Sequence, residues 1–338
     1  MSDKPPPPAS AGTAGSPALH LIVAQAAPPA DPEAQVLRQA FATLALPGLD
    51  ALLRLLSPGA PDAADDDSLS PPHERAMAHA LGLPVADGLI PWAARAAHAA
   101  GLPDAHAPGW AWITPCHWQV GMNEVRQHDP AGLLPDAAES AAFREAVRPW
   151  FAGDGIALHA GPTPGAWLAH GAPLAALPSA SLDRVIGRDI DTWKLGGDAG
   201  RPLRRLQQEM QMFLYTHALN DARECLRRPP VNSFWISGTG DLPTAWAGDP
   251  QPAPQLDRTI ADAWQAGHVA GWTAAWQALD ARLATTLLPA ARAGRAVTLT
   301  LCGERASRSW TLQPGGWIQQ MRRRIAGPDR DRWLDGLS

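Results

Sequence analysis

Apolar residues recur along the chain at spacings that predict several strands and helices. A short apolar run over 19–24 predicts a first strand. Apolar positions three and four apart over 32–56 predict helix, which Pro47 breaks into two. Trp110 and Trp112 alternate with small or apolar residues, as in a strand buried on both faces. Further helices are expected after Ser70, from Ile90 and over 140–150, with strands over 154–159, 167–168, 231–236 and 296–303.

One amphipathic helix, over about 203–228, carries more polar side chains than any other predicted core element. Its apolar stripe predicts that His217 lies on the buried face, with Asn220 on the same face and Arg223 beside it. Two prolines end the helix, and a strand follows that closes in Gly238-x-Gly240. Glycines there would let backbone N–H groups approach a ligand. No helix follows at once, so this turn is neither a Rossmann nor a Walker loop.

Two other stretches place titratable groups at the ends of predicted elements. His73, Glu74 and Arg75 open the helix after Ser70, which can cap it, and a helix N-terminus favours an anion. Ordinary capping with an ion pair explains them equally well. His117 follows the Trp110 strand, where it is either a ligand or proton-transfer group or a satisfied core histidine.

Alternating charges over 180–193 suggest an arginine site. Arg184 and Arg188 are interleaved with Asp183, Asp189 and Asp191. The arginines either reach an anionic substrate, with the carboxylates orienting them, or form an ion-pair network beside a loop. Asp65 to Asp67 are a solvated loop or a weak cation site.

The long apolar segment over 256–288 predicts a helix or helix pair with a tryptophan-rich core. The first 17 residues are expected to be disordered, because they offer little apolar surface to bury. Residues 18–338 then form a single large α/β domain, or two lobes with a connector near 244–256. Arg322 to Arg324 are expected on a solvated helix face.

Charge and cysteine content narrow the function classes. A net charge of −5 over 338 residues argues against general nucleic-acid binding, which needs a basic face. Three scattered cysteines predict neither a disulfide framework nor a structural zinc, and they fit a reducing cytosol. No apolar run reaches membrane-spanning length and no signal peptide is evident, so a cytoplasmic protein with no membrane partner is expected.

The spacing His217-x-x-Asn220-x-x-Arg223, followed by Pro230-x-Asn232 and the Gly-x-Gly turn, resembles one segment of the archaeal-type, cofactor-independent phosphoglycerate mutases of the alkaline phosphatase superfamily. More of the chain resembles the RpfE-type family of phosphoglycerate-mutase-like regulatory proteins from bacteria. That resemblance is carried by the stretches Pro72-His-Glu-Arg-Ala, Thr114-Pro-Cys-His-Trp, Ser181-Leu-Asp-Arg-Val-Ile-Gly-Arg, Arg204-Arg-Leu-Gln-x-Glu-Met-Gln-Met, Val231-Asn-Ser-Phe-Trp-x-Ser-Gly-Thr-Gly and Leu299-Thr-Leu-Cys-Gly-Glu.

The resemblance implies an α/β fold, with a mixed or mostly parallel sheet flanked by helices, alkaline-phosphatase-like or derived from it. It also implies a two-metal mechanism, but the chain departs from that pattern. No acid follows the first predicted strand, and the late Asp-x-x-Gly-His cluster is missing, with His268 instead in a predicted helix. Because two-metal chemistry needs ligands on both ions, we expect no metal, no cofactor and no mutase activity.

Three hypotheses remain. In the first, the protein is regulatory and holds an anionic small molecule or a regulatory protein partner. In the second, it is an enzyme acting on a phosphate ester or other acidic metabolite, with His217 as general acid/base. In the third, the polar residues form a buried structural network. The candidate catalytic residues are His217, His117 and His73, and the candidate substrate-binding residues are Arg223, Asn220, Asn232, Ser233, Gly238, Gly240, Arg184, Arg188, Glu74 and Arg75.

Overall fold

The computed structural model describes residues 18–27, 35–133, 135–266, 269–312 and 336–337. The chain divides into two compact units. Unit 1 comprises residues 1–61, 251–301 and 308–336, and unit 2 comprises residues 62–250, 302–307 and 337–338. In sequence, most of unit 2 is therefore an insertion between two parts of unit 1. The break at 250–251 falls within the Pro/Ala-rich segment 244–256.

Unit 1 is built on a five-stranded sheet with the order β2-β11-β10-β1-β9. Strand β1 of this sheet runs parallel to both of its neighbours, with Val23 paired to Leu301 of β10 on one side and to Asp257 of β9 on the other. Of the neighbouring strands β10, β1 and β9, β1 comes from the first part of unit 1's sequence, and β9 and β10 come from its later part. The bounds are β1 Leu19–Val23, β2 Ser57–Ala63, β9 Gln255–Asp257, β10 Val297–Cys302 and β11 Ala306–Thr311.

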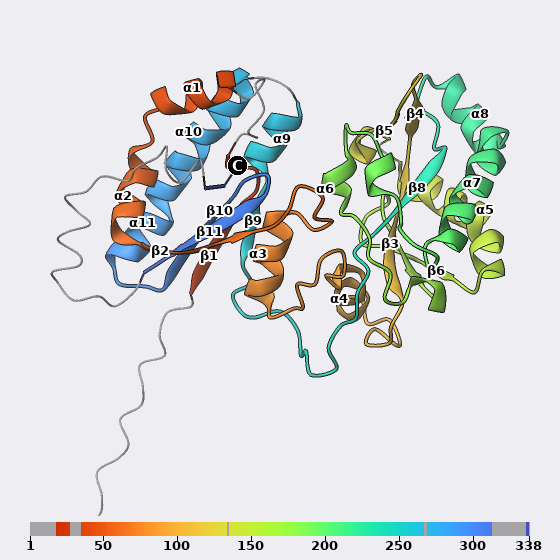
Figure 1. The fold of residues 1–338 in the computed structure, drawn as a ribbon, viewed down its shortest axis with the longest axis horizontal. Coiled ribbons are helices and arrows are strands. Elements are labelled where there is room, and N and C mark those ends of the chain that lie inside the picture. The colour runs from red at the N-terminus through yellow and green to blue at the C-terminus, as the bar shows by residue number, and fades with distance from the viewer. Residues whose placement is uncertain (1–17, 28–34, 134, 267–268, 313–335, 338) are drawn as a thin grey trace, which may run out of the picture. The chain divides into compact units, whose positions relative to one another are not determined.

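The helices of unit 1 gather beside this sheet, as Figure 1 shows. Phe41 lies against Trp276 and Trp272, with ring centroids 4.9 and 5.9 Å apart. The buried Asp280 side chain accepts a hydrogen bond from the backbone N–H of Leu49 at 2.7 Å. This tryptophan-rich core ties the helices at the two ends of the unit together. They are α1 Gln35–Thr43, α2 Pro47–Leu55, α9 Thr259–Gln265, α10 Val269–Thr285 and α11 Leu287–Arg292.

Unit 2 is built on a second sheet, with the order β6-β7-β3-β8, in which every neighbouring pair is antiparallel. The central strand β3 pairs Cys116 with Ser233 and Trp112 with both Leu168 and Ser237. A small hairpin, β4 with β5, follows β3 directly. The bounds are β3 Trp110–Cys116, β4 Trp118–Val120, β5 Val125–Gln127, β6 Ala157–Ala160, β7 Trp167–His170 and β8 Ser233–Ser237.

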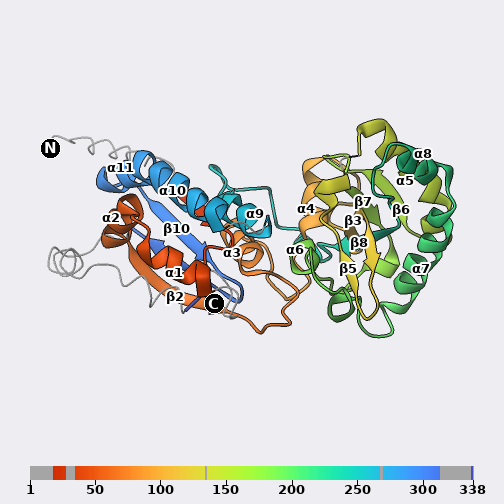
Figure 2. The same ribbon diagram turned by 90° about the horizontal axis from the view of Figure 1, so that it is seen from above.

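Helices cover both faces of this sheet and make a three-layer arrangement (Figure 2). On one face, α5 and α7 pack against alternate residues of β3, such as Ile113, and of β8, such as Phe234. On the other face, α4 packs against β3 and β7, in a cluster with Trp110 and Leu168 that residues of α3 also join. The helices are α3 Pro72–Leu81, α4 Trp92–Ala99, α5 Ala137–Gly153, α6 Leu182–Val185, α7 Arg201–Tyr215 and α8 Ala218–Cys225, with short 3₁₀ turns at Pro130–Leu133, Ala172–Leu174 and Asp191–Trp193.

The α/β class and the flanking helices are confirmed, and unit 1 supplies the parallel strand pairs. The first strand, the helix break at Pro47 and the 296–303 strand also lie where the pattern placed them. The tail over 1–17, His268 and Arg322 to Arg324 fall outside the described residues.

Two local predictions are wrong. The helix over 203–228 is two helices, because α7 ends at Tyr215 and α8 starts at Ala218. Ser70 does not cap α3, whose N-cap position is Pro71 with no side-chain cap. The Ser70 hydroxyl instead accepts a hydrogen bond from the N–H of Gly88 at 2.9 Å.

Among the described residues, no single helix has the length and apolar character needed to cross a membrane. The pair α1 and α2 passes that test only when taken together, and it is bent by 82°.

Candidate functional site

The predicted site residues fall into two separate hydrogen-bonded groups, both within unit 2. One group surrounds the segment 229–232 that leads into β8, and we call it the backbone clamp; it comprises His117, Asn220, Arg223 and Asn232. The other group joins the start of α3 to α6 and to the turn between β10 and β11, and we call it the arginine cluster; it comprises Arg75, Arg184, Arg188, Glu304 and their partners.

Arg223 is the centre of the backbone clamp and exposes only 1% of its surface. Its Nε donates to the carbonyl of Pro229 at 2.7 Å, and Nη2 donates to the carbonyl of Leu133 at 2.9 Å. Its Nη1 donates to the Glu139 carboxylate at 2.6 Å, which balances the charge. All three guanidinium nitrogens donate hydrogen bonds to acceptors of the protein, so Arg223 holds the chain before β8 in place.

His117 and Asn220 hold the next two positions of the same segment, and the Asn232 side chain joins the segment to Trp118. His117 Nδ1 lies 2.9 Å from the carbonyl oxygen of Pro230. Asn220 donates to the carbonyl of Val231 at 2.8 Å and accepts from the Val231 N–H at 2.9 Å. Asn232 accepts from the N–H of Trp118 at 2.7 Å and donates to its carbonyl at 2.8 Å. Consecutive backbone groups are therefore each met by a side chain that the sequence marked as a site candidate.

His217 stands at the start of α8 rather than on a continuous helix face. It is the N-cap residue, and its Nδ1 accepts a hydrogen bond from the N–H of Leu219 at 3.2 Å. Its side chain is partly exposed, so the expectation of a buried histidine is wrong. The helix breaks here because this cap replaces the backbone hydrogen bonds that a continuous helix would make. The role of His217 as an acid or base stays a prediction.

The Gly-x-Gly turn is packed against protein. Gly238 and Gly240 have φ angles of +64° and +127°, which favour glycine. A Cβ on Gly240 would lie 2.1 Å from the carbonyl oxygen of Leu89, and one on Gly238 would lie 2.7 Å from Trp112. Thr239 between them is fully buried and donates to the carbonyl of Leu177 at 2.6 Å. These glycines thus allow close approach of the protein's own segments.

Ser233 of β8 is buried and pairs with Cys116 of β3. Its hydroxyl has no hydrogen-bond partner among the described residues. Burial raises the pKa of the Cys116 thiol, which keeps it protonated and unreactive. This pair therefore offers no nucleophile with a base. No group of three or more His, Cys, Asp or Glu side chains within the described ranges is placed to hold a metal ion.

The arginine cluster draws on three stretches far apart in the sequence. Arg75 of α3 is buried and fully engaged: it bonds Asp62 at 3.1 Å and two backbone carbonyls, those of Ser70 at 2.8 Å and Arg305 at 3.1 Å. Arg188 is half exposed and donates to the Glu304 carboxylate at 2.8 Å. The Glu304 carboxylate therefore lies between the side chains of Arg184 and Arg188.

Arg184 of α6 is the cluster's least satisfied member, although it exposes only 3% of its surface. Its Nη1 lies 3.6 Å from the Glu304 carboxylate and 3.3 Å from that residue's carbonyl oxygen. Its guanidinium carbon lies 5.8 Å from the ring centre of Trp193. Within the part of the chain that the structure describes, its Nε and Nη2 have no hydrogen-bond acceptor. These two nitrogens form one edge of the guanidinium plane.

The electrostatics at Arg184 follow from this packing. Burial lowers its pKa, and the positive charges of Arg188 and Arg75 lower it further. The Glu304 carboxylate opposes the shift. Arg184 and Arg188 share the Glu304 carboxylate, with a smaller contribution from Asp87 at Arg184, and an added anion would further favour the charged guanidinium.

Next to the arginines, α3 carries an acid and a histidine with defined partners. Glu74 accepts hydrogen bonds from the hydroxyl of Ser181 at 2.5 Å and from the indole N–H of Trp92 at 3.0 Å. His73 Nε2 lies 2.9 Å from the carboxylate of Asp183, and His73 is buried. The fold thus brings His73, Glu74 and Arg75 close to the stretch of Arg184 and Arg188, although the sequence indicated these two stretches separately.

Desolvation by burial is the largest influence on Glu74 and raises its pKa above the ordinary value. The Asp183 carboxylate raises it further. Positive charge at His73 and the two hydrogen bonds oppose this shift but do not cancel it. Glu74 thus holds its proton to a higher pH than a solvated glutamate does.

Sequence reasoning did not include Glu304 in this group, and it named Asp183 only as a carboxylate that orients the arginines, without its contact to His73. Both lie in stretches that carried the family resemblance, Ser181-Leu-Asp-Arg and Cys302-Gly-Glu. The signal that could have found them is the presence of a lone carboxylate in each stretch, beside arginines that need a counter-charge. Glu304 meets Arg184, and Asp183 meets His73, across more than 100 positions of sequence, so these contacts depend on the fold.

Comparisons with known proteins give distant likenesses. No family model matches the chain, and no curated protein matches it. Among solved structures, a cofactor-independent phosphoglycerate mutase from Thermoplasma acidophilum is similar at 12% identity and a TM-score of 0.33, over 88% of this chain and 90% of that one. The PH0037 protein from Pyrococcus horikoshii is similar at 11% identity and a TM-score of 0.39, over 92% and 93% of the two chains.

Proposed function

We propose that this protein binds an anionic small molecule, carrying a carboxylate or phosphate group, at the arginine cluster of unit 2. The observation that carries the proposal is one edge of the Arg184 guanidinium, whose buried Nε and Nη2 have no acceptor among the described residues. Two adjacent N–H groups in one plane match two oxygens of a carboxylate or phosphate. A buried charged donor without an acceptor is costly, so a ligand that fills it gains binding energy.

Glu304 supports the proposal because it occupies the position of an internal anion. Its carboxylate is partly exposed, and it reaches both Arg188 at 2.8 Å and Arg184 at 3.6 Å. An incoming anion would compete with Glu304 for these arginines. Arg188 is 43% exposed and so can follow the ligand as it enters. The Glu304 carboxylate therefore sets how tightly an outside anion binds.

The regulatory role follows from binding without evident catalytic machinery. The backbone clamp, which the resemblance made the substrate segment, has its guanidinium and amide groups bonded to the protein's own chain. Binding energy in this protein would then stabilise one state of unit 2 rather than drive a reaction. In the regulatory form of this proposal, a partner protein binds that ligand-stabilised state of unit 2.

Acid–base catalysis on a bound anion is the second candidate. It is favoured by the raised pKa of Glu74 and by the His73–Asp183 pair at 2.9 Å, both next to the arginines. Glu74 would then supply a proton, in place of His217. Turnover of a phosphate ester that is lost in Glu74→Gln, while ligand binding persists, would favour this candidate over simple binding.

The test is a thermal-shift and calorimetric screen of the full chain against inorganic phosphate, 3-phosphoglycerate and simple carboxylates, with and without magnesium. A ligand that binds the native state raises the melting temperature. Arg184→Met should weaken binding by about tenfold or more, since charge-assisted hydrogen bonds are lost. Glu304→Gln should strengthen it, because the internal competitor loses its charge. Arg148→Met removes an exposed arginine of α5 and should change nothing.

Equal binding in wild type, Arg184→Met and Glu304→Gln would overturn the assignment of the site. No stabilisation by any anion of the panel would overturn the binding function itself. A response that requires magnesium, with turnover, would replace it by metal-dependent catalysis.

A further inference from the structure

The hairpin of β4 and β5 brings two histidine side chains together at the end opposite its turn. His117 precedes β4 and His128 follows β5, and the N–H of His128 donates to the carbonyl of His117 at 3.0 Å. The two imidazole rings have centroids 5.1 Å apart, with their planes at 78°. Two imidazoles that bind one tetrahedral metal ion through metal–nitrogen bonds of about 2.0 Å have ring centres about 5 Å apart. The spacing of this pair therefore suits two ligands of one ion.

Each of the two rings is oriented by an oxygen that can only accept a hydrogen bond. His117 Nδ1 lies 2.9 Å from the carbonyl oxygen of Pro230, and His128 Nε2 lies 2.8 Å from Oε1 of Gln119. Both of these nitrogens therefore carry the ring proton. The lone pairs then lie on Nε2 of His117 and Nδ1 of His128, and neither atom has a hydrogen-bond partner within the described residues. Metal-binding histidines show this arrangement, because their other ring nitrogen donates to an oxygen.

The backbone next to the two histidines is held by buried contacts. The indole N–H of Trp118 donates to the buried Gln127 at 2.7 Å, and Asn232 bonds both backbone groups of Trp118. The residue after His117 and the residue before His128 are thus fixed in place. The His117 side chain is partly exposed and that of His128 is exposed, so solvent reaches both rings. A fixed backbone with accessible rings lowers the conformational cost of binding an ion.

The electrostatics around the pair are compatible with a bound cation. Burial lowers the pKa of His117, the hydrogen bond to Pro230 opposes this shift, and the positive charge of His128 adds to it. A lowered pKa keeps a lone pair on the ring available near neutral pH. Arg126 lies two residues before His128, but it donates to the Glu124 carboxylate at 2.6 Å, which balances its charge.

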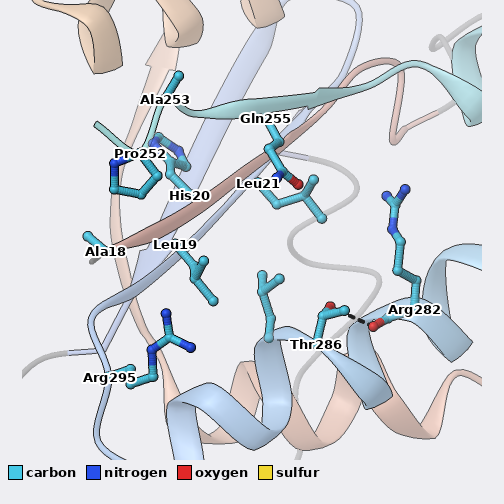
Figure 3. Close-up of a pocket in the computed structure, with 11 residues that line it drawn as sticks. Ala18, Leu19, His20, Leu21, Pro252, Ala253, Gln255, Arg282, Thr286 and Arg295 are labelled. Atoms are coloured by element: carbon cyan, nitrogen blue, oxygen red, sulfur yellow. Dashed lines mark hydrogen bonds between the residues drawn. The ribbon is translucent and has the colours of Figure 1, made fainter. Parts of the chain in front are cut away.

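Other histidines of the described chain lack part of this arrangement. The rings of His98 and His106 are also 5.1 Å apart, and His106 Nδ1 lies 3.1 Å from the carbonyl oxygen of Pro243. Among the described residues, however, no hydrogen bond orients the ring of His98. Figure 3 shows a cavity of about 340 Å³ in unit 1 that is lined by a single histidine, His20. Its Nε2 lies 2.8 Å from the hydroxyl of Thr300.

We propose that His117 and His128 bind a divalent transition-metal ion, zinc or copper, through Nε2 and Nδ1 respectively, with water in the remaining coordination positions. Imidazole nitrogen suits these ions, whereas magnesium prefers oxygen ligands. Within the described residues, no third His, Cys, Asp or Glu side chain joins the pair, so the site differs from a closed structural zinc site. The inference does not rest on the anion binding proposed for the arginine cluster.

The experiment titrates the full, untagged chain with Zn²⁺ by calorimetry and with Cu²⁺ by electron paramagnetic resonance. We expect one zinc ion per chain, no competition from millimolar magnesium, and copper coupled to two imidazole nitrogens. His128→Gln should weaken zinc binding by about tenfold or more, because one of the two protein ligands is lost. His98→Gln changes a histidine pair of the same spacing, and this matched control should bind zinc as wild type does.

Two further variants test the second ligand and the orientation of the first. His117→Gln should weaken zinc binding as much as His128→Gln does. Because His117 also holds Pro230, its unfolding free energy is measured alongside, and the exposed His128 keeps the test decisive if this variant does not fold. Gln119→Leu leaves both ligands in place but removes the acceptor that orients His128, so we expect an intermediate loss of affinity.

Equal zinc affinity in wild type, His117→Gln and His128→Gln would place the ion elsewhere and overturn the site. Copper coupled to fewer than two imidazole nitrogens would overturn the shared coordination, and effective competition by magnesium would indicate oxygen ligands instead. Absence of zinc binding at about 100 μM would overturn the proposal as a whole. Arg184→Met should leave the zinc affinity unchanged, which separates failure here from failure at the arginine cluster.

Discussion

Arg223 and Arg184 are both buried arginines of unit 2, exposing 1% and 3% of their surface, but their guanidinium groups are satisfied to different degrees. Arg223 donates from all three nitrogens to a carboxylate and two carbonyls. Arg184 reaches acceptors only through Nη1, and within the described residues its other edge has none. The dense polar sequence around Arg223 indicated a site there. Arg184, however, is the residue whose N–H donors lack acceptors within the described residues.

The largest expected effect is at Arg223. Arg223→Ala should lower the free energy of unfolding by about 3 to 5 kcal/mol, because the Glu139 carboxylate and two carbonyls lose their donor. Urea unfolding followed by circular dichroism measures this. Arg228→Ala, which removes an exposed arginine 3.9 Å from the same carboxylate, should cost less than about 1 kcal/mol. Equal losses in the two variants would contradict a clamp centred on Arg223.

Asn220 provides the next test of the clamp. Asn220→Asp keeps the shape but replaces a donor with a negative oxygen facing the carbonyls of Leu214 and Val231. We expect a loss of about 2 to 3 kcal/mol in unfolding free energy, since buried acceptors then face each other unpaired. The loss should shrink at low pH, where aspartic acid regains a proton to donate. A mutant as stable as wild type at neutral pH would show that the amide orientation is unimportant.

Glu74, which lies beside the arginine cluster, gives a pH-dependent test of that region. Its folded-state pKa is raised by burial, so between the unfolded value near 4.5 and the higher folded value the folded state binds more protons. The stability contributed by protonated Glu74 is therefore present below the unfolded pKa and is lost as pH rises through the folded one. Glu74→Gln should remove that decline. The measurement is the difference in unfolding free energy between the two proteins from acid to neutral pH, and a difference that does not change with pH would refute this interpretation.

The smallest effect on stability is expected at Arg184. Arg184→Met should change the unfolding free energy by less than about 1 kcal/mol in either direction, because an incompletely bonded buried charge contributes little net stability. Glu304 keeps Arg188 as a partner at 2.8 Å. A loss as large as that of Arg223→Ala would mean that Arg184 is structural as well, and the contrast between the regions would disappear.

The local elements were largely predictable, because each depends on neighbours in sequence. The strand at Leu19 follows from its apolar run, and the break at Pro47 follows from the missing N–H of proline. The break at His217 was not predictable from pattern, since the apolar stripe continues through it and histidine is not a common cap. The spacing of apolar residues alone does not show where a side-chain nitrogen accepts a hydrogen bond that a backbone carbonyl of a continuous helix would otherwise accept.

The site was predictable only in part, for a related reason. The position of His73, Glu74 and Arg75 at a helix start and the interleaved charges around Arg184 can be read locally. Which of these groups meet, and which lack a partner, depends on contacts between residues more than 100 positions apart. The same distance hid the role of the clamp, because the carbonyls it holds belong to a segment whose path a single sequence does not specify.

The insertion of unit 2 within the sequence of unit 1 has a consequence for the order in which the protein is made. The strand Leu19–Val23 is synthesised well before its neighbours in the sheet, which are residues 255–257 and 297–301. The hydrogen bond between His20 and Thr300 spans 280 residues. Every strand of the unit 2 sheet lies between Trp110 and Ser237, so that sheet can close while β1 still waits for partners. Glu304 is synthesised after both arginines that it contacts, so their ion pairs form only once residue 304 has been made.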